Sequence, residues 1–167
     1  MARRLLPALA VAAAFLASGC AGPGTGQPSA GLSGRISDSG VTVAAVLTAE
    51  PDGTGYVRVT FSPQRPGYHL YSIHLPPDGV NGLGIPTIVT VRDGLRMTGS
   101  PTADVPDSNL RIAELNVNLP VYPAEPVTVT VPVRRTGNRQ PEVLVTYGAC
   151  SATACLPPVR NRPIILV

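Results

Sequence analysis

The chain has 167 residues, and its 13 basic residues, all arginine, outnumber ten acidic ones, giving a formal net charge of +3. Two of these arginines, Arg3 and Arg4, lie in a segment that we expect to be removed, so the mature chain is close to neutral. Near-neutrality excludes a nucleic acid or another polyanion as the partner. Nineteen prolines exclude long helices.

The first predicted element is an export signal over residues 1–19. Arg3 and Arg4 precede an apolar stretch, residues 5–16, that is too short to span a bilayer, and small residues lead into Cys20. This pattern resembles a bacterial lipoprotein signal peptide, which implies acylation of Cys20 and an extracytoplasmic chain anchored by lipid to the bacterial cell membrane. An ordinary cleaved signal with an incidental cysteine is the alternative.

Residues 20–37 follow, rich in Gly, Ser and Pro and poor in apolar bulk. We expect them to form a flexible tether to one domain that spans residues 38–167. That domain is long enough to bury its own core. Outside the cytoplasm disulfides persist, so paired cysteines are plausible there.

The domain is predicted to be all-β. Runs of β-branched and aromatic residues alternate with Gly, Pro, Asp and Asn clusters, and Val127, Val129, Val131 and Val133 alternate with polar residues or proline, as in a strand with one buried face. Several short strands in a domain of this length indicate a β-sandwich. The predicted strands cover residues 41–49, 56–61, 68–73, 87–91, 110–116, 127–133, 143–147 and 164–167.

Cys150 and Cys155 are the strongest chemical signal in the chain. The only other cysteine is Cys20. The spacing permits a disulfide if the segment folds back as a tight loop. A loop of this size gives only about 2 kcal/mol of chain-entropy stabilisation, whereas a small strained loop at the surface favours exchange. Redox exchange and a structural bridge both remain open on spacing alone.

A metal site is the weaker reading of the same residues. Structural zinc needs four ligands, and the chain offers two thiols with His69 and His74. Two thiolates could instead bind Cu(I), with Met97 as a soft additional ligand. Our prediction is that the domain holds no metal and no cofactor.

Three segments resemble a known family. Residues 145–158 (VTYGACSATACLPP) resemble the active-site segment of the N-terminal periplasmic domain of DsbD, the thiol:disulfide interchange protein. Residues 66–72 (PGYHLYS) are similar to the strand of that family with a Pro-Gly-aromatic start, and residues 76–87 are similar to its Pro-rich loop. The three occur in the family's order, between about residue 38 and residue 167.

The resemblance implies an immunoglobulin-like β-sandwich with a redox-active disulfide, in which Cys155 forms the mixed disulfide with partners and Cys150 resolves it. It implies that Tyr68 and Tyr71 lie near the thiols. Tyr147 and Pro157, which flank the cysteines in the motif, are further supporting residues.

A cap loop over the thiols is also implied, and chain order places it within residues 100–109. That loop lacks the aromatic ring of the best-known members. Leu83 or Ile85 of the loop over residues 76–86 could substitute for it.

The implied role is electron transfer between a membrane reductant and thioredoxin-like extracytoplasmic proteins, a protein-disulfide reductase-like activity. Because the chain ends at Val167, the membrane electron-transfer protein and the thioredoxin-like protein are expected to be separate partners of a monomer. Whether the chain is an enzyme is left open. The alternative is a non-catalytic β-sandwich lipoprotein that binds a protein partner and uses the disulfide only as a structural staple.

Overall fold

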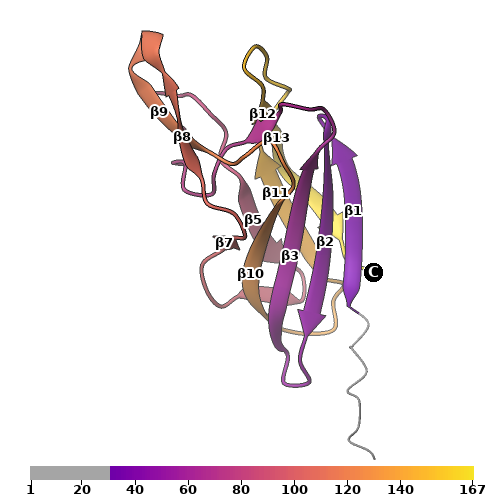
Figure 1. Ribbon diagram of the computed structural model, residues 1–167. Helices are drawn as coiled ribbons and strands as arrows, with labels where there is room; N and C mark the ends of the chain where they lie inside the picture. The colour runs from indigo at the N-terminus through magenta and orange to yellow at the C-terminus, as the bar shows by residue number, and fades with distance from the viewer. Residues whose placement is uncertain (1–30) are drawn as a thin grey trace, which may run out of the picture.

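The computed structural model describes residues 31–167, so the predicted signal peptide, Cys20 and most of the predicted tether lie outside the described range. In that range two sheets pack face to face (Figure 1). The larger sheet has the order β1-β2-β3-β10-β6, with β7 also paired to β10, and the smaller has the order β13-β11-β5. The strands of the larger sheet are β1 (Leu32–Asp38), β2 (Val41–Ala49), β3 (Thr54–Pro63), β6 (Leu95–Met97), β7 (Thr102–Ala103) and β10 (Val127–Arg135). Those of the smaller are β5 (Ile88–Arg92), β11 (Glu142–Tyr147) and β13 (Val159–Ile165).

Alternating side chains build the core between the two sheets. In β10 the four valines predicted to share one face are all buried, while Thr128 and Thr130 between them are partly exposed. Strands β2 and β3 repeat this alternation, and the smaller sheet contributes Val143, Val145 and Ile164 from its inner face. Burial of every second side chain is the pattern of a sheet with one face on the core and one face exposed to solvent, and it confirms the predicted all-β sandwich.

Strand β1 begins earlier than the predicted domain boundary at residue 38. It pairs with β2 along its whole length, from Leu32 opposite Leu47 to Asp38 opposite Val41. Leu32 and Ile36 pack against the main core, and Ser33 and Val167 exchange two backbone hydrogen bonds of 2.9 Å. Residues 32–37 are therefore part of the sandwich and not of a tether, because pairing satisfies their backbone and buries their few apolar side chains.

Two small pairings occupy one end of the sandwich. Strand β4 (His69–Leu70) pairs with β12 (Ala149–Cys150), and β8 (Ser108–Ile112) pairs with β9 (Val117–Val121). The β8–β9 hairpin projects from this end, and the loop between β12 and β13 lies at the same end (Figure 1).

The predicted strand 110–116 stops at Ile112, where a 3-10 turn (Ala113–Leu115) begins. Asn116 then closes the hairpin in the left-handed conformation, at φ 49°, which asparagine tolerates better than most residues. The predicted strand 68–73 is reduced to β4 and an isolated bridge at Tyr71.

Candidate functional site

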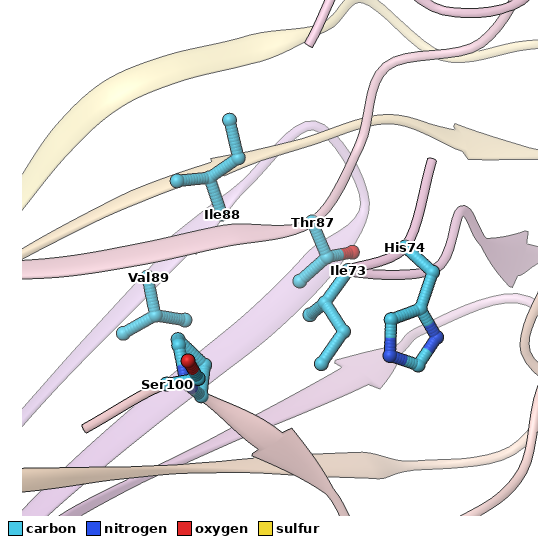
Figure 2. A pocket seen from close by; sticks show the side chains of 7 residues that line it. Ile73, His74, Thr87, Ile88, Val89 and Ser100 are labelled. Carbon is cyan, nitrogen blue, oxygen red and sulfur yellow. The ribbon is translucent and has the colours of Figure 1, made fainter. Parts of the chain in front are cut away.

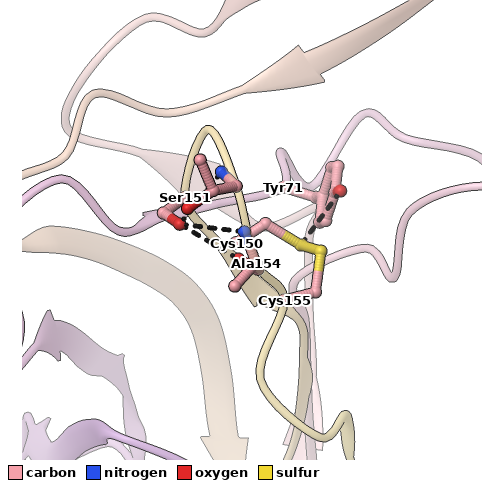
Figure 3. Close-up of a disulfide and its surroundings, with 6 residues drawn as sticks. Tyr71, Cys150, Ser151, Ala154 and Cys155 are labelled. Carbon is pink, nitrogen blue, oxygen red and sulfur yellow. Dashed lines mark hydrogen bonds between the residues drawn. A yellow bond between two sulfur atoms is a disulfide. The ribbon is translucent and has the colours of Figure 1, made fainter.

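A disulfide joins Cys150 and Cys155, with an S–S distance of 2.01 Å and a Cα–Cα distance of 4.0 Å (Figure 3). The segment between them folds back as a tight loop. The backbone N–H of Ser151 donates to the carbonyl of Ala154 at 2.7 Å, and the Ser151 Oγ accepts from the backbone of Thr153 and Ala154. Local hydrogen bonds of this kind are why serine favours turns. The loop therefore brings the two sulfurs together, as the spacing permitted.

The two cysteines differ in exposure. Cys150 is only 6% exposed and belongs to a second hydrophobic cluster, distinct from the main core, that includes Leu75, Leu119 and Val121. Cys155 is exposed to solvent. Strand β12 continues from the buried strand β11, whereas Cys155 lies in the returning loop, so Cys150 is the protected residue of the pair and Cys155 the exposed one. Cys155 is therefore the more accessible cysteine to a thiol from outside.

Tyr71 is the hydrogen-bonding neighbour of the buried sulfur. Its hydroxyl donates to Cys150 Sγ at 3.3 Å (Figure 3). The backbone of Tyr71 is held between two segments by bridges to Pro86 and Val121, and its carbonyl accepts from Thr87 Oγ1 at 2.6 Å. Burial raises the pKa of Tyr71 above its ordinary value of 10.0, so the hydroxyl stays protonated and remains a donor at neutral pH.

His69 is the second polar side chain beside the disulfide. It is the cross-strand partner of Cys150 in the β4–β12 pair, and its ring packs edge-on to Tyr71 with centroids 6.0 Å apart. Its Nε2 is buried and has no hydrogen-bond partner within the described residues. Burial lowers the pKa of His69 below 6.5, so the imidazole is neutral at pH 7.

These side chains line a groove of about 550 Å³ that is open to the surface. One side is formed by β4, Tyr71 and the cysteine loop; the other is formed by Leu110, Arg111, Ile112 and Glu114 of the β8–η1 segment. No residue of the predicted cap, 100–109, lines it, and neither do Leu83 and Ile85. This second part of the lining therefore comes from the end of β8 and the turn of the projecting hairpin, just after the predicted cap in the chain.

The other predicted supporting residues lie away from the groove. Tyr68 packs against the main core, because residues 68 and 69 point to opposite sides of the chain. Tyr147 is also in the main core, where its hydroxyl donates to the Asp38 carbonyl at 2.9 Å and burial raises its pKa to about 12. Pro157 is exposed and does not line the groove, and Met97 packs against the main core from β6.

Sequence reasoning weighed His69 as a zinc ligand but did not assign it to the groove beside the disulfide, although a signal for that position was available. In an extended segment residues 69 and 71 share a side, so the inclusion of Tyr71 implies His69 and not Tyr68. The family pattern leaves the residue at this position unspecified, so the resemblance alone gave no reason to select His69.

A second cluster of polar side chains lies near another cleft. The carboxylate of Asp107 accepts hydrogen bonds from the Ser72 hydroxyl and from His74 Nδ1, the latter at 2.8 Å, and Ser72 is fully buried. Both partners bind the same carboxylate oxygen, so the serine is not aligned with the free ring nitrogen as a hydrolytic triad requires. The cluster ties the segment after β4 to the loop before β8.

The cleft beside this cluster has a volume of about 300 Å³ and is lined mainly by apolar side chains, among them Ile73, Ile88 and Val89 (Figure 2). His74 lies at its edge, with its ring more than two thirds exposed. No cysteine or carboxylate lines this cleft.

Residues 31–167 show neither a cluster of metal ligands nor a membrane-spanning helix. No three His, Cys, Asp or Glu side chains gather there in a way that could hold a metal ion. None of these residues forms a helix long and apolar enough to cross a membrane.

Neither a protein-family model nor a curated protein matches the sequence. The fold does match solved structures. The N-terminal periplasmic domain of ScsB from Proteus mirabilis is similar over 82% of this chain, with a TM-score of 0.57 and 13% identity. This chain covers 51% of that domain's chain, about half its length. The N-terminal domain of Neisseria meningitidis DsbD, in its reduced form, gives a TM-score of 0.43 at 16% identity, over 82% of this chain and 90% of that one.

The likeness to the ScsB domain agrees with the fold that the sequence motifs implied. In this chain two facing antiparallel sheets carry the cysteine segment at one end. Residues 31–167 thus have the fold of the ScsB N-terminal periplasmic domain, a β-sandwich.

Proposed function

We propose that this chain carries out extracytoplasmic thiol:disulfide exchange through Cys150 and Cys155. The observation that carries the proposal is the position of the disulfide, which lies in an open groove with one cysteine exposed and the other buried beside a hydroxyl donor. A bridge that served stability alone would gain only about 2 kcal/mol from so short a loop, and the sandwich already has a large core.

The asymmetry of the pair assigns the two sulfurs different steps. A partner thiolate attacks Cys155 Sγ, the Cys150–Cys155 bond breaks, and a mixed disulfide forms between Cys155 and the partner. Cys150 leaves with the electron pair as a thiolate, next to the Tyr71 hydroxyl. A second thiolate of the partner then attacks the partner's own sulfur in the mixed disulfide and releases Cys155. The partner is oxidised, and the domain holds two electrons as a dithiol.

The reverse sequence passes these electrons on. Cys155 attacks the disulfide of an oxidised client, and Cys150 resolves the resulting mixed disulfide by attacking Cys155. The motif resemblance supports a membrane electron-transfer protein as the donor and thioredoxin-like proteins as the clients, with the chain held at the membrane by a lipid on Cys20. The groove supports a protein partner, because exposed Leu110 and Leu115 beside it offer apolar contact area.

The competing function is that of a non-catalytic binding lipoprotein with a structural disulfide. The observation in its favour is the burial of Cys150 within the second hydrophobic cluster, where the cross-link ties β12 to the returning loop at Cys155. On that view the disulfide resists reduction for as long as the domain stays folded.

Redox titration and trapping separate the two functions. The oxidised protein is equilibrated with graded glutathione or dithiothreitol while near-UV circular dichroism reports the fold. Exchange predicts reduction of the folded protein. A disulfide that persists until the domain unfolds would refute it.

Trapping tests the order of the steps. The Cys150→Ser variant should accumulate mixed disulfides with thioredoxin-like proteins through Cys155. The matched Cys155→Ser variant should accumulate few, because its remaining sulfur is buried. Equal trapping by both variants would contradict the assignment.

A further inference from the structure

His69 is a half-buried residue with one buried ring nitrogen that makes no hydrogen bond in the oxidised protein. That atom, Nε2, has no partner within the described residues, although His69 lines the groove that holds both cysteines. An unsatisfied buried polar atom costs stability, on the order of 1–3 kcal/mol, and native proteins contain few of them. Such a group is more readily explained by a partner that exists only in another state of the site.

The strand register identifies that partner. His69 and Cys150 lie directly opposite each other in the antiparallel β4–β12 pair. Side chains at such positions share a face, with Cβ atoms about 4.5–5.5 Å apart. In the oxidised state Cys150 Sγ is bonded to Cys155 and carries no proton. Once that bond opens, Cys150 becomes a thiol or thiolate on the same face of the strand pair as the imidazole.

We propose that His69 is the acid–base residue of this site, exchanging a proton with Cys150 each time the disulfide opens or closes. The inference rests on the proposed exchange function and adds to it a proton path on a residue that the motif pattern does not specify. Tyr71 supplies a fixed hydrogen bond to the same sulfur but keeps its own proton.

The proton balance of the two directions is as follows. When a partner thiolate opens the disulfide, Cys150 leaves as a thiolate; the imidazole takes one proton from water, passes that proton from Nε2 to the sulfur, and returns to its neutral form. When the reduced domain reduces a client, the neutral imidazole removes the Cys150 proton, and the thiolate attacks Cys155 in the mixed disulfide. The departing client thiolate, or water, then receives that proton.

The charged and titratable groups that face His69 are few. Tyr71 is on the same segment, Cys150 and Cys155 are on the cysteine loop, and Arg111 and Glu114 lie across the groove with opposite charges. No other acidic or basic side chain lines the groove. A change in the protonation of His69 on reduction should therefore report on the sulfur beside it.

The first test is an NMR titration of the two histidine rings in the full chain, oxidised and reduced. His74, which is exposed and lies outside the groove, is the internal control. The proposal predicts that the midpoint of His69 moves on reduction while that of His74 does not. Superimposable His69 titrations in the two redox states would overturn it, and this test requires no variant that might fail to fold.

The second test compares His69→Gln with His74→Gln. The glutamine at residue 69 keeps a hydrogen-bond donor but does not titrate. We expect resolution of the mixed disulfide to slow by about 100-fold, the low end of the range for acid–base groups because Tyr71 still binds the sulfur, and the pH–rate profile to lose one step. His74→Gln should match the wild type. Profiles of His69→Gln and wild type that superimpose would also overturn the proposal.

Failure of the underlying function gives a different result. In that case the folded wild-type protein itself resists reduction and Cys150→Ser traps no partner. Failure of the His69 proposal alone leaves reduction and trapping intact and removes only the redox-linked shift and the pH step.

Discussion

Replacing Tyr71 by Phe removes one hydroxyl from beside Cys150 Sγ and leaves the ring in place. Tyr71 is 7% exposed, so water cannot take over the lost hydrogen bond. A hydrogen bond to a charged group contributes about 1.5–3 kcal/mol, against about 1 kcal/mol for a neutral pair. This difference in hydrogen-bond free energy stabilises the thiolate of Cys150 relative to its thiol. A loss of about 1.4 kcal/mol corresponds to a tenfold decrease in the thiolate population.

We therefore expect the Tyr71→Phe protein to hold about tenfold less Cys150 thiolate than the wild type at a given pH, and to resolve mixed disulfides more slowly in proportion. The Cβ carbon shift of Cys150 in the reduced protein, followed against pH, measures that population. Tyr68→Phe is the matched control, because Tyr68 packs on the main core and should leave the titration unchanged. If the two variants titrate like the wild type, the hydroxyl of Tyr71 does not stabilise the thiolate.

Two further variants test the interactions around the site. Asp107→Asn should lower the free energy of unfolding at neutral pH by about 1 kcal/mol, measured by urea titration, because the carboxylate accepts from Ser72 and His74. Those hydrogen bonds hold the pKa of Asp107 below its ordinary 3.8, so its stabilisation is present above that pH and is lost as the pH falls through the lowered value. An equal acid-side loss in the variant would exclude Asp107 as its source. Tyr147→Phe should cost about 1 kcal/mol through the lost bond to the Asp38 carbonyl, yet leave the rate of disulfide reduction unchanged. A slower reduction would mean that the main core and the groove are coupled.

The sandwich was predictable where strands were long enough to show a period. The 41–49 prediction coincides with β2 and the 127–133 prediction lies within β10, because alternate valines in these strands face one core. Strands β6, β7 and β12 have two or three residues each, too few for any period, and are set by pairing with distant segments. Strand β1 was assigned to the tether because its Gly and Ser content resembles a linker; its pairing with β2 determines its structure.

The site was predictable in its sulfurs and only partly in its surroundings. Cys150 and Cys155 are close in sequence, so their pairing is a local property of a turn-forming segment. Of the two tyrosines expected near the thiols, Tyr71 hydrogen-bonds Cys150, whereas His69 and not Tyr68 lines the groove beside it. The wall formed by residues 110–114 depends on where a hairpin closes, and the left-handed turn at Asn116 that closes it left no clear pattern in the sequence.

The mutual hydrogen bonds of Ser33 and Val167 bring the beginning and the end of the sandwich together. In Figure 1 the start of β1 lies at the pole opposite the β8–β9 hairpin and the cysteine loop. If a lipid on Cys20 holds the chain, the domain is attached through the end of the sandwich that lies opposite the disulfide, and the disulfide points away from the point of attachment. A soluble carrier could then be met in the aqueous space, whereas an embedded donor would be reached only when the whole domain tips toward the bilayer.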